Sequence, residues 1–400
     1  WASVNGTPFN RRDGIDSHLS GAIVVDPEEY DGSDRILILG EYQQRNDQSN
    51  IVEAAQYTIN GRSWPTTERI DVNVGETNRW HIVNGAFAGH PMHLHGIHYR
   101  VAGLTDGNTY QHIATADQRH VVTEVVDPGQ TMTMEWEAAN AGNWLFHCHI
   151  VAHVDPANMY SVRGAQSRDY NHFHEQHMSG MTLGIHAHGS DKYDTDATPN
   201  RTLTMELNHV ENHFGDRPGI AVAFDEPGMT ENPPVVPGPP LFLHKNELVS
   251  IEIINNLQEP TSIHWHGMEL QSFFDGVAGF GGKGGSITPE IQPGSSFEVR
   301  MQPPKAGTFI YHTHLNDEAQ LSAGLYGAMI VNDPADPHDS DTDRIFVIGL
   351  LGETNPEGLR FGGRRLGING SSSHQQQFST GQQYRLRLIN IADNNAGFAV

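Results

Sequence analysis

The only cysteine of the chain, Cys148, lies between two histidines in the run Asn143-Trp-Leu-Phe-His147-Cys148-His149-Ile150. Side chains alternate between the two faces of a β-strand, so on a strand the thiolate points one way and both imidazoles point the other. A metal bound on each face would be joined to the other by a few covalent bonds. Taken alone, the triplet is equally compatible with a buried, inert cysteine or with a simple zinc site.

Three further segments carry histidines two residues apart, and these segments are His90-Pro-Met-His93-Leu-His95-Gly96, His264-Trp-His266-Gly267 and His312-Thr-His314. On a strand, each pair places both imidazoles on one face. Imidazole binds copper, zinc and iron, whereas a thiolate favours copper or zinc. A structural zinc site needs only four ligands, so this surplus of donors favours copper.

The spacing of the donors sorts them into sites. His90 is three residues from His93 and should point away from it, while His153 follows the Cys148 strand in a turn-like stretch. His90, Cys148 and His153 can therefore form a site of the two-histidine, one-cysteine type that gives blue copper. Eight histidines remain, in two sets of four that suit a multinuclear cluster at a domain interface: His93, His95, His147 and His149, and His264, His266, His312 and His314.

The composition narrows the class of protein. A length of 400 residues predicts two to three domains, and a formal charge of -24 argues against a nucleic-acid or anionic-membrane partner. No apolar run approaches the roughly 20 residues that span a bilayer. The single cysteine excludes an internal disulfide framework. The chain begins at Trp1 and ends at Val400, directly after a strand-like segment, so we expect both ends to be cut and targeting signals to be unreadable.

Short apolar alternations separated by Gly, Pro, Asn and Asp predict antiparallel β-sandwiches. Internal repeats support several related β-domains: residues 20–27 resemble 326–334, and Ile59-Asn-Gly61 followed by 74–84 resembles Ile368-Asn-Gly370 followed by 380–390. Residues 244–255 are a third relative of the latter strand. These repeats place boundaries near residues 28, 190 and 336, with a polar linker at 190–199.

Together, the four histidine motifs resemble those of the laccase-like multicopper oxidases, and the resemblance covers nearly the whole chain. It implies an all-β fold of tandem cupredoxin-like Greek-key β-sandwiches. The first 28 residues would be the tail of a preceding domain, 29–190 and 191–336 two copper-bearing cupredoxin domains, and 337–400 the start of a further domain without copper motifs. Three-domain members have these two domains in the reverse order. The chain is thus expected to come from a longer array or a permuted one, with the cluster formed within one chain or across an oligomer.

The resemblance also assigns ligands for about four copper ions. It implies that His90, Cys148 and His153 hold the type 1 copper and that His93 and His264 hold the type 2 copper. The binuclear type 3 pair would then be held by His95, His147, His149, His266, His312 and His314. Electrons would pass through Cys148 to His147 and His149.

The sequence motifs identify two further candidate site residues less directly. The usual axial position, ten residues after Cys148, is Asn158, with Met159 beside it. Ser179-Gly-Met181-Thr-Leu-Gly-Ile185 resembles the strand after the family's axial ligand, so we expect Met181 to be axial and residues 159–178 to be an inserted loop; a core methionine is the alternative. Asp275 resembles the family's proton-relaying acid near the type 2 copper, or is simply a turn residue before Gly276.

Some members carry a glutamate after the second type 1 histidine, where this chain has Val154. The insertion and its flank add His172, His174, His177, His186 and His188, which could recruit copper, shape substrate access or form a solvated polar loop.

The resemblance implies a copper-dependent oxidase that couples four one-electron oxidations of a small reductant, by default a phenol or aromatic amine, to reduction of O₂ to water. It also implies a secreted, periplasmic or extracellular location. A copper nitrite reductase would need only type 1 and type 2 sites, and a copper store or electron shuttle would leave eight histidines unexplained.

Overall fold

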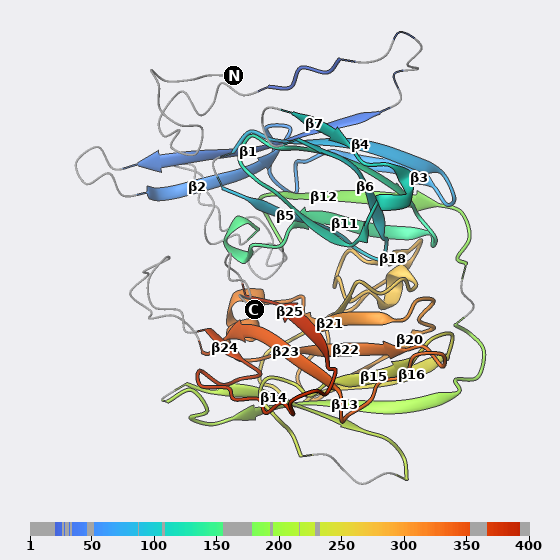
Figure 1. The fold of residues 1–400 in the computed structure, drawn as a ribbon, viewed down its shortest axis with the longest axis vertical. Helices are drawn as coiled ribbons and strands as arrows, with labels where there is room; N and C mark the ends of the chain where they lie inside the picture. Colours follow the sequence, from blue (N-terminus) through green and yellow to red (C-terminus); the bar gives the residue numbers. More distant parts are fainter. Residues whose placement is uncertain are drawn as a thin grey trace. The chain divides into compact units, whose positions relative to one another are not determined.

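In a computed structural model of the chain, the structure describes residues 21–25, 28, 32, 34–45, 52–86, 88–105, 109–154, 178–192, 195–215, 217–228, 233–352 and 366–392. The chain divides into two compact units, residues 1–190 and 191–400 (Figure 1). Each unit is described by itself.

The first unit contains β1 (Arg35–Arg45), β2 (Val52–Ile59), β3 (Arg69–Asn73), β4 (Thr77–Asn84), β5 (His90–Leu94), β6 (Tyr99–Thr105), β7 (Tyr110–His112), β8 (His120–Val121), β9 (Thr123–Val126), β10 (Thr131–Glu137), β11 (Gly142–Cys148) and β12 (Thr182–His188), with 3₁₀ turns at Thr115–Asp117 and Val151–His153. One sheet has the order β2-β1-β4-β10-β6-β7, with β8 also on β6. The other has the order β3-β12-β11, with β5 beside β11 and β9 beside β5.

The two sheets of this unit form the layers of a sandwich (Figure 1). Along β3 the burial alternates strictly, as expected for a strand with one face on a core. The ring of Trp80 on β4 packs edge-on against Trp136 on β10, at 4.9 Å between centroids, and against Phe146 on β11, at 5.3 Å. Because Phe146 belongs to the second sheet, these contacts join the layers close to the strand that carries Cys148.

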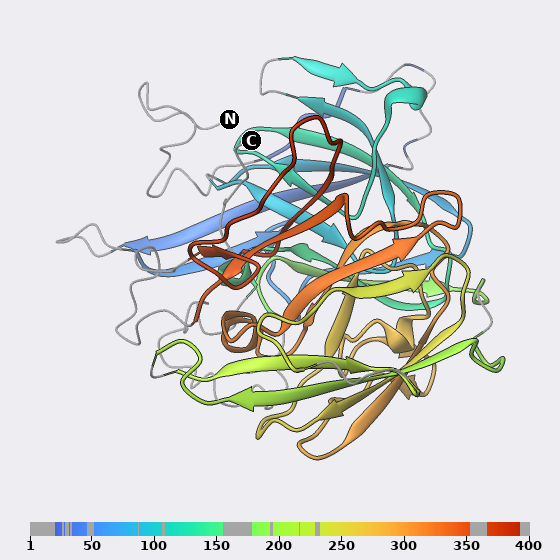
Figure 2. The ribbon, with the colours of Figure 1, turned by 60° about the horizontal axis from the view of Figure 1, so that its bottom comes forward.

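The second unit contains β13 (Arg201–Val210), β14 (Gly219–Asp225), β15 (Leu241–His244), β16 (Val249–Asn255), β17 (Ile263–His266), β18 (Gly282–Lys283), β19 (Ser286–Ile287), β20 (Ser296–Met301), β21 (Gly307–Thr313), β22 (Tyr326–Asn332), β23 (Asp343–Leu350), β24 (Leu366–Ile368) and β25 (Arg385–Asn390), with a 3₁₀ turn at Ser272–Phe274 and helix α2 at Asp317–Ser322. Its sheets have the orders β14-β13-β16-β20, β15-β22-β21-β17 and β24-β23-β25. The long β13–β14 hairpin is clear in Figure 2. Leu203, Ile251, Trp265 and Tyr311 belong to one core between the first two sheets.

The predicted all-β sandwich class is confirmed, and the expected antiparallel pairing holds for most but not all of the described strand pairs. Parallel pairs join β1 to β4, β3 to β12, β13 to β16, β15 to β22 and β23 to β25. Each parallel pair joins strands that are not consecutive in the sequence, as Greek-key connections require. Alternation of apolar residues reports which face is buried but carries no information about strand direction.

Segments that resemble one another in sequence form the same turn in both units. Asn60, after β2, and Asn369, after β24, have φ values of 51° and 50°. The Asn60 Oδ1 accepts the Ile38 N–H at 2.8 Å, and the Asn369 Oδ1 accepts the Val347 N–H at 2.8 Å. Asparagine tolerates this left-handed conformation and can bond to nearby main chain.

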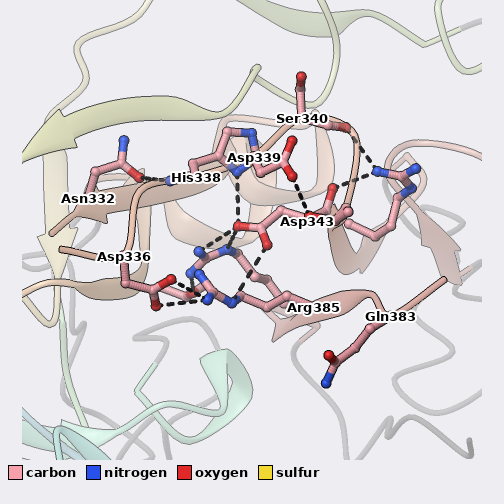
Figure 3. A network of polar contacts seen from close by, with 12 residues as sticks. Asn332, Asp336, His338, Asp339, Ser340, Asp343, Gln383 and Arg385 are labelled. Carbon is pink, nitrogen blue, oxygen red and sulfur yellow. Dashed lines mark hydrogen bonds and ion pairs between the residues drawn. The ribbon is translucent and has the colours of Figure 1, made fainter. Parts of the chain in front are cut away.

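An ion-pair network surrounds the buried carboxylate of Asp343 in the second unit (Figure 3). Asp343, at the start of β23, accepts hydrogen bonds from the Arg387 guanidinium at 2.7 and 3.1 Å and lies 3.1 Å from His338 Nδ1. Arg385 Nε lies 3.6 Å from the same carboxylate. Arg387 also donates to Thr308 Oγ1 on β21 at 2.8 Å, so one arginine joins two sheets.

Within the described ranges, no helix has the length and apolar character required to cross a bilayer.

Candidate metal centres

Three predicted donors of the first unit converge at one end of the sandwich. His90 Nδ1 lies 3.1 Å from His153 Nδ1, and Cys148 Sγ lies 3.5 Å from the former and 3.4 Å from the latter. Metal bonds of about 2.0 Å to nitrogen and about 2.3 Å to sulphur put donors that share a trigonal ion roughly 3.5 Å apart. The three atoms therefore have the spacing of ligands to a single ion.

Three different elements supply these donors. His90 begins β5, Cys148 ends β11, and the adjacent strands pair Cys148 with Met92. His153 ends the 3₁₀ turn that follows β11, and its N–H bonds to the Ile150 carbonyl at 2.9 Å. The short turn folds His153 back beside the cysteine five residues earlier.

Burial sets the protonation of this site. It lowers the pKa of His90 to about 3, and burial, followed by the neighbouring His90, lowers the pKa of His153. Burial also raises the pKa of the Cys148 thiol to about 12, which a hydrogen bond from the Ile150 main chain opposes and the Glu41 carboxylate reinforces. Both imidazoles are thus neutral and able to bind a metal at neutral pH, while the thiol must lose its proton to do so. Among the described residues, the His90 Nε2 is buried without a hydrogen-bond partner, and its Nδ1 is the atom turned to the other donors.

Met181 lies directly against this site through its main chain. Its N–H donates to the His153 carbonyl at 3.1 Å, and its carbonyl accepts the Cys148 N–H at 3.0 Å. The side chain is fully buried. Val154, where some family members carry a glutamate, is also buried. Met159, the alternative axial residue, lies outside the described residues.

The second set of donors in the first unit lies on the other face of β11. His95 Nε2 is 2.9 Å from His147 Nε2, and the His93 ring centroid is 4.7 Å from that of His95 and 5.6 Å from that of His149. One nitrogen each of His93, His95 and His147 lies within 4.8 Å of the other two. Cys148 and His147, adjacent in the chain, thus belong to different donor sets.

Main-chain oxygens orient these rings. His93 Nδ1 lies 2.7 Å from the Val122 carbonyl, and His147 Nδ1 lies 2.8 Å from the Cys148 carbonyl. An imidazole whose Nδ1–H is held by an oxygen presents Nε2 to a metal, as is usual for metal-binding histidines.

Gly96, directly after His95, has φ of +63°, and a Cβ there would lie 2.1 Å from the Trp144 ring. Only glycine therefore allows the chain to turn at this point.

The four predicted donors of the second unit also gather together. In the antiparallel pair β17–β21, His264 lies directly opposite His312. The His264 ring centroid lies 5.6 Å from that of His266, 5.3 Å from that of His312 and 5.5 Å from that of His314. His312 Nδ1 is 2.6 Å from the Thr313 carbonyl, the same arrangement that His147 has with Cys148.

Asp275 is fully buried beside His264. Its carbonyl lies 2.8 Å from His264 Nδ1, and its carboxylate Oδ1 lies 3.3 Å from the same atom. It follows a 3₁₀ turn and precedes Gly276, which has φ of +86°. A Cβ on Gly276 would lie 1.9 Å from the Ile263 carbonyl oxygen. Asp275 is therefore both a turn residue and a neighbour of a predicted ligand, so the two interpretations are compatible.

The additional histidines are distributed differently. His186 and His188, on β12, lie 2.7 Å from Asn143 Oδ1 and 2.8 Å from Asp71 Oδ1 through one ring nitrogen each. Neither belongs to a described group of three close donors. His172, His174 and His177 lie outside the described residues.

Sequence reasoning missed the residues that surround the donors. The Tyr57 ring stacks on His153, with centroids 4.0 Å apart, although the two residues are far apart in the sequence. Thr123 Oγ1 lies 3.1 Å from His93 Nδ1. Main-chain acceptors such as the Val122 carbonyl leave no sequence signal, whereas a tyrosine facing the core next to a donor cluster can be found once strand register is known.

Sequence profiles of the multicopper oxidase family match residues 36–168 and 228–336, more than half of the chain. The chain therefore belongs to the multicopper oxidase family, as its motifs predicted. A relative, Multicopper oxidase MmcO of Mycobacterium tuberculosis, is 29% identical over 170 residues, covering 42% of this chain and 30% of that protein. Laccase-2 of Botryotinia fuckeliana is 31% identical over 236 residues, covering 51% and 38%.

L-ascorbate oxidase of Cucumis sativus is 40% identical over 102 residues, which cover 24% of this chain and 16% of that protein. Among solved structures, a multi-copper oxidase from Pseudomonas thermotolerans matches at 24% identity and a TM-score of 0.39, covering 48% of this chain and 46% of that one. The chain spans less than two fifths of the length of each of these curated relatives.

Proposed function

We propose that this chain carries the copper centres of an oxidase that transfers single electrons from a small reductant to O₂. The observation that supports this most strongly is that two adjacent residues of β11 belong to different donor sets. Cys148 lies in one set and His147 lies in the other. When bound, copper would supply the one-electron redox chemistry and the reduction of O₂. The chain itself supplies ligands, the covalent connection between them and the exclusion of water.

The first donor set fits a type 1 copper. Two neutral imidazoles and a cysteine sulphur, all buried, are the ligands of blue-copper electron-transfer sites. We propose that His90, Cys148 and His153 hold this copper and that Met181 is its axial ligand. Burial of the three donors keeps water from the site and so favours electron transfer over ligand exchange.

The other eight histidines are proposed to hold the type 2 and type 3 coppers. His93 and His264 would bind the former, and His95, His147, His149, His266, His312 and His314 the latter. Each unit gathers four of these rings on its own. The proposed cluster combines the two sets, because a binuclear pair and a third copper need more ligands than either set offers. Residues 29–190 and 191–336 would then be two cupredoxin domains, with 1–28 and 337–400 belonging to further ones.

Asp275 is proposed to move protons. Reduction of O₂ to water consumes one proton per electron, so a buried acid near the reacting oxygen speeds the reaction. Asp275 is fully buried, and its Oδ1 lies 3.3 Å from His264 Nδ1. The Asp275 carboxylate would transfer protons toward the proposed copper cluster, while the main-chain carbonyl of Asp275 keeps the His264 ring in place.

For the reductant we propose a phenol or an aromatic amine, by analogy with the relative named Laccase-2. A periplasmic or extracellular location is likewise proposed from the resemblance to the laccase-like multicopper oxidases. The net charge of -24 is consistent with small-molecule partners rather than nucleic acid.

Metal analysis with optical and EPR spectroscopy tests the proposal on the full-length protein. We expect about four coppers per functional unit, an intense blue thiolate band and O₂ consumption with phenols. Cys148→Ser should abolish the blue band and the oxidase activity while retaining the other coppers. His186→Ala, outside both donor sets, is the matched control and should leave the copper content unchanged. A parent protein with one copper, or one that consumes no O₂ with any phenol, would contradict the proposal.

A further inference from the structure

The Tyr57 ring covers the most exposed ligand of the proposed type 1 site. His90 and Cys148 are completely buried, whereas His153 retains 6% of its exposure. Tyr57 stacks on His153 with centroids 4.0 Å apart and ring planes 25° apart, and it meets the His90 ring edge-on at 6.4 Å. One aromatic ring therefore contacts both histidines at the point where the site approaches solvent.

Tyr57 belongs to a cross-strand pair that faces the donors. In the antiparallel pair β1–β2, Glu41 lies directly opposite Tyr57, so their side chains share a face. Both side chains are buried. The β1–β2 hairpin thus contributes two buried polar residues on one face, and one of them stacks on His153.

Strand register identifies the equivalent pairs elsewhere in the chain. Leu39 lies opposite Asn84 in the parallel pair β1–β4, Leu207 opposite Asn255 in β13–β16, and Ile348 opposite Asn390 in β23–β25.

Two residues further along β1, β13 and β23, the cross-strand pairs are Glu41–Tyr57, His209–Ile220 and Leu350–Leu366. The acid–tyrosine pair occurs on the hairpin that faces the cysteine and its two histidines. The β23–β24 hairpin, which has no such donors among the described residues, has two leucines instead.

A stacked ring can control a metal ligand in two ways. It fixes the ring plane of the imidazole, since offset-stacked aromatic pairs have a preferred geometry. It also keeps water from the ligand, and solvent access is one of the properties that set the reduction potential of a metal site. Water near His153 would stabilise the more highly charged oxidised state and lower the potential.

We propose that Tyr57 is a positioning residue of the type 1 site, which holds the His153 ring and keeps the reduction potential high by excluding water. This inference rests on the proposed function, because it requires a copper bound by His90, Cys148 and His153. It assigns no new ligand. The hydroxyl of Tyr57 has no part in it, so the ring alone carries the effect.

The test compares Tyr57→Leu, which installs the residue found in the β23–β24 hairpin, with Tyr57→Phe in the copper-loaded, full-length protein. The type 1 potential is measured by redox titration of the blue band, and the ligand geometry by the copper hyperfine splitting in EPR. Tyr42→Leu is the matched control, because Tyr42 is the aromatic residue of the partner strand β1 and its side chain points to the opposite face from Glu41.

We expect Tyr57→Leu to raise the ratio of oxidised to reduced type 1 copper about tenfold at a fixed poise, a fall of about 59 mV for a one-electron couple. Its EPR splitting should also change, while Tyr57→Phe and Tyr42→Leu retain the parental potential and spectrum. Should Tyr57→Leu fail to fold, Tyr57→Met replaces the ring with a longer, flexible chain that adapts to irregular core space and should show the same shift.

An unshifted potential in Tyr57→Leu or Tyr57→Met would overturn the inference, and so would an equal shift in Tyr57→Phe. A parent protein without a blue band would instead refute the proposed function itself.

Discussion

Replacing Gly276 with alanine tests how much stability depends on the close packing of the Asp275–Gly276 turn against the strand that carries His264. At a φ of +86° an L-residue is strained, which costs alanine about 1–2 kcal/mol. The added Cβ would also lie 1.9 Å from the Ile263 carbonyl oxygen and 2.9 Å from the His264 main-chain nitrogen. Since main chain cannot move aside as a flexible side chain can, overpacking adds about 1–3 kcal/mol. The expected loss is therefore about 2–5 kcal/mol.

Gly294→Ala provides the matched control. Gly294 has a similar φ of +72°, but no heavy atom of the described residues lies within 4 Å of its added Cβ. It should lose only the backbone part, about 1–2 kcal/mol. Urea denaturation of both variants measures the difference, and copper analysis after loading shows whether the displaced His264 still binds. Equal midpoints for the two variants would refute the argument that the Gly276 turn is held against the ligand strand.

Three other predictions concern separate parts of the chain. Met181→Leu should raise the type 1 potential, because an axial thioether stabilises oxidised copper; an unchanged redox titration would exclude Met181 as axial ligand. In copper-stripped protein, a Cys148 pKa of about 12 leaves about 10⁻⁴ of the thiol ionised at pH 8. Iodoacetamide should therefore react with Cys148 about 10³-fold more slowly than with a thiol of pKa 9, and the rate should increase as the pH rises. A rate near that of free cysteine would contradict the raised pKa. Asp343→Asn should cost about 1–3 kcal/mol in urea denaturation, because it leaves the largely buried Arg387 guanidinium without its carboxylate, while Asp339→Asn should cost little; similar losses would argue against the network.

Much of the donor geometry follows from the alternation of side chains between the two faces of a strand. The spacing of His90 from His93 placed them in different sets, and the alternation of His147 and Cys148 did the same on β11. The structure has both separations. A two-residue period needs only local sequence, so strand alternation alone is enough to predict these separations.

The surroundings of the donors depend on long-range register, which local sequence does not specify. Tyr57 meets His153 only because β1, β2 and the turn after β11 come together at one end of the sandwich. The parallel pairing of β1 with β4 was missed for the same reason. Likewise, the carbonyl of Asp275 that holds His264 is a main-chain atom, and any residue type would supply it.

The adjacency of His147 and Cys148 has a consequence for how such a protein can be adjusted. The rate of electron transfer depends on driving force and on electronic coupling. The coupling between the two proposed centres would run through the backbone of β11 and the contact of 2.8 Å between His147 Nδ1 and the Cys148 carbonyl, which few substitutions can alter. The driving force would depend on side chains such as the proposed positioning residue Tyr57 and the proposed axial ligand Met181, which can be substituted without changing that backbone route. Natural or engineered variants could therefore change which reductants are oxidised without lengthening the route that their electrons take.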